Sequence, residues 1–150
     1  MFETMNKATI LIIGYGNTLR NDDGIGPYLA DQIALENNPL IKTIAVHQLT
    51  PELVTAIAEV EQVIFIDANS DPDCQEIQIK TLEAEAKPTG LDHTGCPSYL
   101  LALTKSLYGH TPQAWLMMIP ALNFEFGETF SDLTIHAIPQ ALKQVQVMIG

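Results

Sequence analysis

The chain has 150 residues, of which 47% are hydrophobic and 17% charged, a composition typical of one folded domain and not of a disordered chain. Acidic residues (18) outnumber basic ones (7) and give a formal net charge of -11, so nucleic acids and anionic membranes are not expected partners. The first apolar run is too short for a signal peptide or a membrane span, and the two cysteines form no disulfide framework, so we expect a cytoplasmic protein with reduced thiols.

Apolar patterning predicts alternating strands and helices. Residues 9–13 form a β-branched apolar run that ends at a glycine, which indicates a strand buried on both faces. The following segments predict a helix over 25–36, a strand over 41–46, a helix over 51–60 and a strand over 63–66 that ends at Asp67.

The second half of the chain continues this alternation. Apolar and polar residues alternate over 76–82, which predicts a half-exposed edge strand that could run antiparallel to the others. A helix over 97–108, a strand over 114–119 and a helix over 132–148 follow. This order predicts an α/β fold, a single domain spanning residues 1–150, with a mostly parallel sheet covered by helices on both faces.

The loop after the first strand, residues 14–26, is rich in glycine and aspartate. Its Gly14 and Gly16 begin like a G-x-G-x-x-G dinucleotide motif, but Leu19 stands where the third glycine is required. The second strand also ends in His47 and not in an acidic residue that could hold a ribose. The alternative is that the glycines permit a close backbone turn.

Asp22 and Asp23 end this loop, at the carboxyl end of the predicted sheet. One of them is expected to cap the helix that begins near residue 25, and the other to face a cation or a donor. Asp67 follows another strand, so Asp23 and Asp67 would face each other across the crevice at the topological switch point. A turn or capping role is the alternative for Asp67.

His93 lies in a later loop, directly before a predicted helix. Two aspartates and a histidine are a ligand set suited to Zn, Ni or Mn, although a solvated surface histidine is the alternative. Cys96 could pair with His93 as a nucleophile, or be a buried, inert thiol. Phe124 and Phe126 lie in a looser stretch and either contact a partner or seal the core.

Residues 12–27 read I-I-G-x-G-N-x-L-x-x-D-D-G-x-G-P and resemble the opening of the [NiFe]-hydrogenase maturation endopeptidases. The resemblance continues through Asp67, the His93 loop and the last strand with Pro120. It implies a three-layer α/β/α sandwich with a five-stranded sheet, one strand antiparallel. It also implies that Asp23, Asp67 and His93 are the metal-binding and catalytic residues.

The resemblance implies a specific reaction as well. Family members remove a C-terminal peptide from the hydrogenase large-subunit precursor after nickel insertion, and the nickel held by that precursor is what they recognise. This chain departs from the family by reading His47-Gln48-Leu49-Thr50 where many members have an Asp-Gly-Gly-Thr-like stretch. That variant is similar to proteases of bidirectional, NAD-linked hydrogenases, and it makes His47 and Gln48 candidate substrate contacts.

Two functions of a different class remain alternatives, both of them binding modules. One is a nickel chaperone without protease activity, and the other is a small-nucleotide binder that uses Gly14 and Gly16. We expect a monomer, because the partner would be a much larger precursor that binds transiently.

Overall fold

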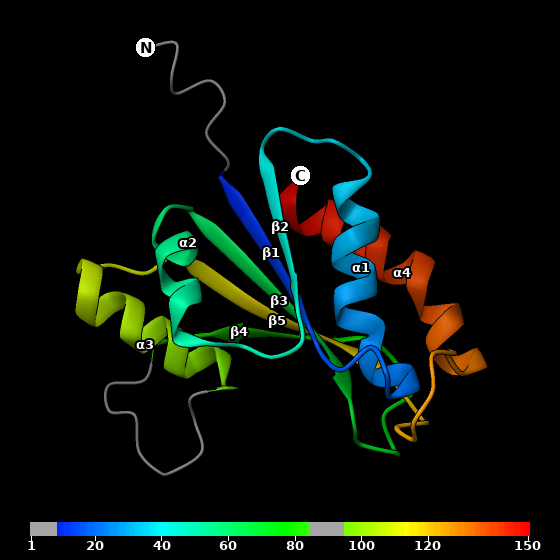
Figure 1. Ribbon diagram of the computed structural model, residues 1–150. Helices are drawn as coiled ribbons and strands as arrows, with labels where there is room; N and C mark the ends of the chain where they lie inside the picture. The colour runs from blue at the N-terminus through cyan, green and yellow to red at the C-terminus, as the bar shows by residue number, and fades with distance from the viewer. Residues whose placement is uncertain (1–8, 85–94) are drawn as a thin grey trace.

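The computed structural model describes residues 9–84 and 95–150, and in these ranges it contains five strands and four α-helices (Figure 1). The strands are β1 (Ile10–Tyr15), β2 (Ile41–Val46), β3 (Gln62–Asn69), β4 (Gln78–Leu82) and β5 (Gln113–Pro120). The helices are α1 (Ile25–Ala34), α2 (Val54–Ala58), α3 (Pro97–Tyr108) and α4 (Asp132–Ile149), with short 3₁₀ helices η2 (Asn21–Gly24) and η3 (Pro51–Leu53). Each predicted strand and helix is present, with altered bounds in several.

The five strands form one sheet in the order β2-β1-β3-β5-β4. The pairs β1–β2, β1–β3 and β3–β5 are parallel, whereas β4 runs antiparallel to β5 at the edge. The predicted antiparallel edge strand is therefore confirmed. Because β2 lies on one side of β1 and β3 on the other, the chain reverses its direction of travel along the sheet at β1.

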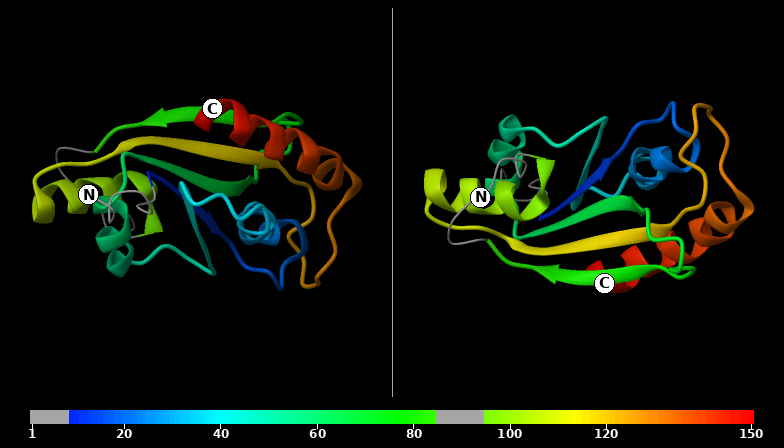
Figure 2. Two further views of the ribbon diagram at one scale, coloured as in Figure 1. Left: turned by 90° about the horizontal axis from the view of Figure 1, so that it is seen from above. Right: turned by 90° about the horizontal axis from the view of Figure 1, so that it is seen from below.

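Helices cover both faces of the sheet, which confirms the three-layer α/β/α sandwich (Figure 2). Alternate residues of each strand point to opposite faces. On one face, Ile10 and Ile12 of β1 pack in a cluster with apolar side chains of α1 and α4. On the other, Leu11 and Ile13 pack with those of η3, α2 and α3. None of the helices in the described ranges is long and apolar enough to cross a membrane.

Strand β3 is longer than the predicted 63–66 and runs to Asn69. Its last pair with β1 is Ile66 with Gly14, but its pairing with β5 continues through Asp67 and Met118 to Asn69 and Pro120. Asp67 therefore lies within the strand and not in a turn, so the turn alternative for this residue is wrong. It stands one residue beyond the point where β1 leaves the sheet.

Candidate functional site

The candidate site lies where β1 and β3 separate. After β1 the chain enters η2 and α1 on one face of the sheet, and after β2 it enters η3 and α2 on the other. Two strands whose connections leave on opposite faces open a crevice at their carboxyl ends. The predicted position of the crevice is confirmed.

Gly14 and Gly16 allow the start of α1 to pack directly against the end of β1. A methyl group on Gly14 would overlap the carbonyl oxygen of Gly26, and one on Gly16, whose φ is 147°, would overlap that of Asp23. The space beside these glycines is therefore filled by the chain's own backbone, which leaves no room there for a nucleotide phosphate. The glycines instead set the position of Asp23.

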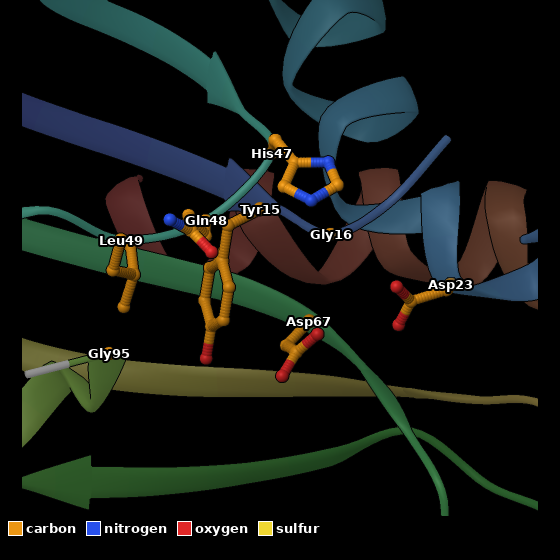
Figure 3. Close-up of a pocket in the computed structure, with 8 residues that line it drawn as sticks. All are labelled: Tyr15, Gly16, Asp23, His47, Gln48, Leu49, Asp67 and Gly95. Carbon is orange, nitrogen blue, oxygen red and sulfur yellow. The ribbon is translucent and has the colours of Figure 1, made fainter. Parts of the chain in front are cut away.

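Asp23 is half-buried and faces the crevice (Figure 3). The Asn17 backbone N–H donates a hydrogen bond of 2.8 Å to its Oδ2, and its own N–H donates to the Arg20 carbonyl oxygen at 3.1 Å. The carboxylate is thus held from two sides within one turn of the chain, which fixes its direction.

Asp67 approaches the same crevice from β3. Its Oδ1 accepts a hydrogen bond of 2.8 Å from the Ala68 N–H. Burial raises the pKa of Asp67 to about 6, and the charge of Asp23 adds to the rise, whereas the hydrogen bonds from Ala68 and from the Tyr15 hydroxyl oppose it. Asp23 and Asp67 are therefore close enough to repel each other measurably.

Tyr15 is a member of the site that the sequence did not point to. Its side chain stands beside Asp67 and lines the crevice (Figure 3). Burial and the negative charge of Asp67 raise the pKa of Tyr15, so its hydroxyl stays protonated and can donate to that carboxylate. An aromatic residue between the two glycines of a turn motif carries no sequence signal that separates a site residue from a packing residue.

The crevice contains a pocket of about 340 Å³. Its lining combines the two carboxylates with the predicted substrate contacts from the loop after β2 and with the residue before α3: Tyr15, Gly16, Asp23, His47, Gln48, Leu49, Asp67 and Gly95 (Figure 3). His47 and Gln48 are exposed at this pocket. Four of the five residues predicted for the site thus lie together.

His93, the fifth, lies outside the described residues. Within 9–84 and 95–150, no three His, Cys, Asp or Glu side chains converge as a complete metal site. The two carboxylates that do converge are oxygen donors of the kind that a divalent ion accepts. The structure thus contributes two of the three predicted ligands and leaves the histidine as a prediction.

Asp22 does not cap α1, and neither does Asp23, so this expectation is wrong. Neither η2 nor α1 has a side-chain hydrogen bond at its N-cap. Asp22 is fully buried and accepts hydrogen bonds from the N–H groups of Leu122 (2.8 Å), Asn123 (3.0 Å) and Ser131 (2.7 Å) and from the Ser131 hydroxyl (2.7 Å). Its partners lie about 100 residues away, and it stabilises the loop that leads into α4.

Two other sequence alternatives are also decided. Cys96 occupies the N-cap position of α3 and is half-buried, so it is not the fully buried thiol that was expected. Phe126 is 83% exposed and does not seal the core, whereas Phe124 is partly buried. Both cysteines are free.

Comparisons of the sequence with protein-family models and with curated proteins give no match. Solved structures do match. The hydrogenase maturating endopeptidase HybD from E. coli superposes with a TM-score of 0.76 at 21% identity, over 94% of this chain and 91% of that one. A hydrogenase 2 maturation peptidase from a Thaumarchaeota archaeon gives 0.69 at 21% identity over 95% and 98%, and the [NiFe] hydrogenase maturation protease HycI from Thermococcus kodakarensis gives 0.67 at 20% over 93% and 90%. The chain therefore has, over nearly its whole length, the fold of these peptidases.

Proposed function

We propose that the protein is an endopeptidase that removes the C-terminal extension of the [NiFe]-hydrogenase large-subunit precursor after nickel insertion. The observation that carries the proposal is the pair Asp23 and Asp67, which meet in one pocket at the switch point of the sheet. The fold around this pair is that of solved hydrogenase maturation endopeptidases. A peptide substrate explains why the pocket is open to solvent and lined by exposed polar residues.

Nickel enters this proposal as part of the substrate. Asp23 raises the pKa of Asp67, so the two carboxylates together are electrostatically unfavourable. A divalent cation held by the precursor relieves that repulsion when it docks between them. We propose that His93 supplies a third contact. Binding is then stronger for the nickel-loaded precursor than for the empty one.

The hydrolysis adds water across the scissile peptide bond: the water oxygen bonds to the carbonyl carbon, and the amine leaves with a proton. The docked ion can polarise the carbonyl, as a Lewis acid does. Asp67, with its pKa of about 6, can accept a proton from the attacking water near neutral pH. Both routes require the Asp67 carboxylate to be ionised.

His47 and Gln48 border the pocket in the position of the family's acidic stretch. We propose that they contact the precursor near the cleaved bond and adapt the site to the large subunit of a bidirectional, NAD-linked hydrogenase. Processing of that precursor but not of an uptake-type precursor supports this assignment, and equal processing of both contradicts it.

The direct test uses purified protein, nickel-loaded precursor and the mass of the large subunit. The wild-type protein is expected to remove the extension, and the Asp23→Asn and Asp67→Asn variants are expected to be slower by about 10²-fold or more. Asp71→Asn is the matched control, because Asp71 is exposed and outside the pocket. Unchanged cleavage by both site variants would sink the proposal.

The same preparation tests the two binding-module alternatives. A nickel chaperone binds nickel tightly on its own and leaves the precursor uncut, whereas the proposed protease needs only an open, partial site. A nucleotide binder gives heat on titration with NAD in a calorimeter. The backbone packed beside Gly14 and Gly16 argues against this last outcome.

A further inference from the structure

Two loops more than 100 residues apart in the sequence are joined beside the crevice. The Asn21 N–H donates to the Gly127 carbonyl and the Gly127 N–H to the Leu19 carbonyl, each at 2.8 Å, and the Asp22 N–H donates to the Asn123 carbonyl at 3.0 Å. Arg20 and Gly127 form a parallel β-bridge. The segment before Asp23 therefore pairs with the segment between β5 and α4, as the adjacent loops in Figure 2 show.

Side chains reinforce this pairing. Asn21, which is buried and has a φ of 47°, donates from Nδ2 to the Glu125 carbonyl (3.0 Å) and accepts at Oδ1 from the Thr129 N–H (2.9 Å). Gly127, with a φ of 155°, lies so close that a methyl group on it would overlap the Asn21 side chain. Together with the four hydrogen bonds to Asp22, these contacts hold an irregular segment in one conformation.

The joined loops present large apolar side chains to solvent. Leu19 is 47%, Leu122 58% and Phe126 83% exposed, and we call these three residues the apolar ridge. In a parallel bridge, the residues that precede the paired ones lie side by side on one face, which places Leu19 next to Phe126. An exposed aromatic side chain on a firmly held loop is the arrangement of an interface anchor.

We propose that the apolar ridge binds the folded body of the protein substrate while the cleaved segment lies in the crevice; this inference rests on the proposed endopeptidase function. The ridge is continuous with the crevice, because Leu19 and Asp23 belong to one short segment and the Asp23 N–H bonds to the Arg20 carbonyl. A polypeptide that reaches Asp23 and Asp67 passes beside it.

Charge defines the partner surface further. Glu125 and Glu128 are exposed in the same loop, and the net charge of the chain is -11. The complementary surface is therefore an apolar pocket bordered by lysine or arginine side chains. Such a contact makes precursor binding weaker as the salt concentration rises.

The test is the kinetics of cleavage of the nickel-loaded precursor by Phe126→Ser and by the double variant Leu19→Ser/Phe126→Ser. Each is expected to raise KM, by about tenfold for the single variant, with kcat at saturation and the unfolding temperature unchanged. Leu35→Ser is the matched control, since Leu35 is 72% exposed but follows the far end of α1. It is expected to leave KM unchanged.

The outcomes separate the two proposals. Absence of cleavage by the wild-type protein overturns the endopeptidase function itself. Normal wild-type cleavage with an unchanged KM in the double variant overturns only the ridge, as does an equal rise of KM in Leu35→Ser. A wild-type dimer in light scattering that becomes a monomer in the double variant assigns the ridge to a second copy of the chain and also overturns the proposal.

Discussion

Asp22 and Asp23 are neighbours in the sequence, yet their carboxylates face opposite surroundings. Asp22 is fully buried among backbone N–H donors, whereas Asp23 faces the open crevice. Successive residues of the 3₁₀ helix η2 point about 120° apart, so one turn of chain serves both purposes. Adjacent like charges are tolerated here because each carboxylate has its own partners.

Asp22 makes the stability of the protein dependent on pH. Burial alone would raise its pKa, but the hydrogen bonds from Leu122, Asn123 and Ser131 hold the pKa below its ordinary value. The stabilisation is therefore present above the unfolded-state pKa of about 3.9 and is lost as the pH falls through the lower folded-state value. Asp22→Asn turns an amide toward these donors and is expected to lower the free energy of unfolding at pH 7 by about 3 kcal/mol.

Denaturant unfolding of the wild-type protein and of Asp22→Asn at pH 7 and at acidic pH checks this expectation. The difference in the free energy of unfolding is expected to shrink below about pH 4. The Asp73→Asn variant, at an exposed aspartate, is the control and is expected to change little. A difference that is the same at both pH values would contradict the role given to the Asp22 carboxylate.

Asp67 makes the cleavage reaction dependent on pH. Burial and the charge of Asp23 raise its pKa to about 6, so the ionised fraction falls about tenfold per pH unit below that value. The quotient kcat/KM, which reports on the free enzyme, is expected to be constant above about pH 7 and to fall below about pH 6. An ordinary aspartate would keep the rate constant down to about pH 4. The nickel content of the precursor, measured at each pH, is the control.

Single residues were predictable where the edge of the sheet determines their place. Asp23 and Asp67 follow from two strands whose carboxyl ends meet, and the structure brings them together. The partners of Asp22 could not be predicted, because they belong to a loop about 100 residues further along the chain. Tyr15 was missed because the orientation of a residue within a turn depends on tertiary packing.

At the scale of elements, local periodicity predicted most of the fold. The bounds of β2 and α3 agree with the prediction, because apolar spacing and the prolines or glycines around them mark both ends. The predicted helix over 51–60 is instead a 3₁₀ turn followed by the short α2. The extension of β3 through Asp67 was not predictable, since it depends on pairing with β5.

The packing of α1 against β1 depends on Gly14. A Gly14→Ala methyl group would overlap the Gly26 carbonyl oxygen and lie 3.0 Å from the Ala30 Cβ, so α1 must move away from the sheet. We expect a loss of about 1–3 kcal/mol or more in the free energy of unfolding, as for an overpacked core. Gly95→Ala is the matched control, because nothing lies within 4 Å of its added methyl group. Equal stability of the two variants in denaturant titrations would contradict this packing.

At the scale of the whole molecule, the sheet collects separate parts of the chain at one edge. The loop after β1, the loop after β2 and the end of β3 supply the pocket, and the loop before α4 adds the apolar ridge. A domain of 16.5 kDa thereby offers a continuous surface from a pair of carboxylates to an exposed aromatic side chain. This layout suits a large protein substrate better than a small ligand.

The most direct test of the account is paired incubation of the protein with nickel-loaded and nickel-free precursor of the same sequence. The mass of the large subunit is followed over time in both samples. We expect loss of the C-terminal extension only from the nickel-loaded precursor, because a cation between Asp23 and Asp67 relieves their repulsion. Equal cleavage of both forms would contradict recognition through nickel, and cleavage of neither would contradict the proposed endopeptidase.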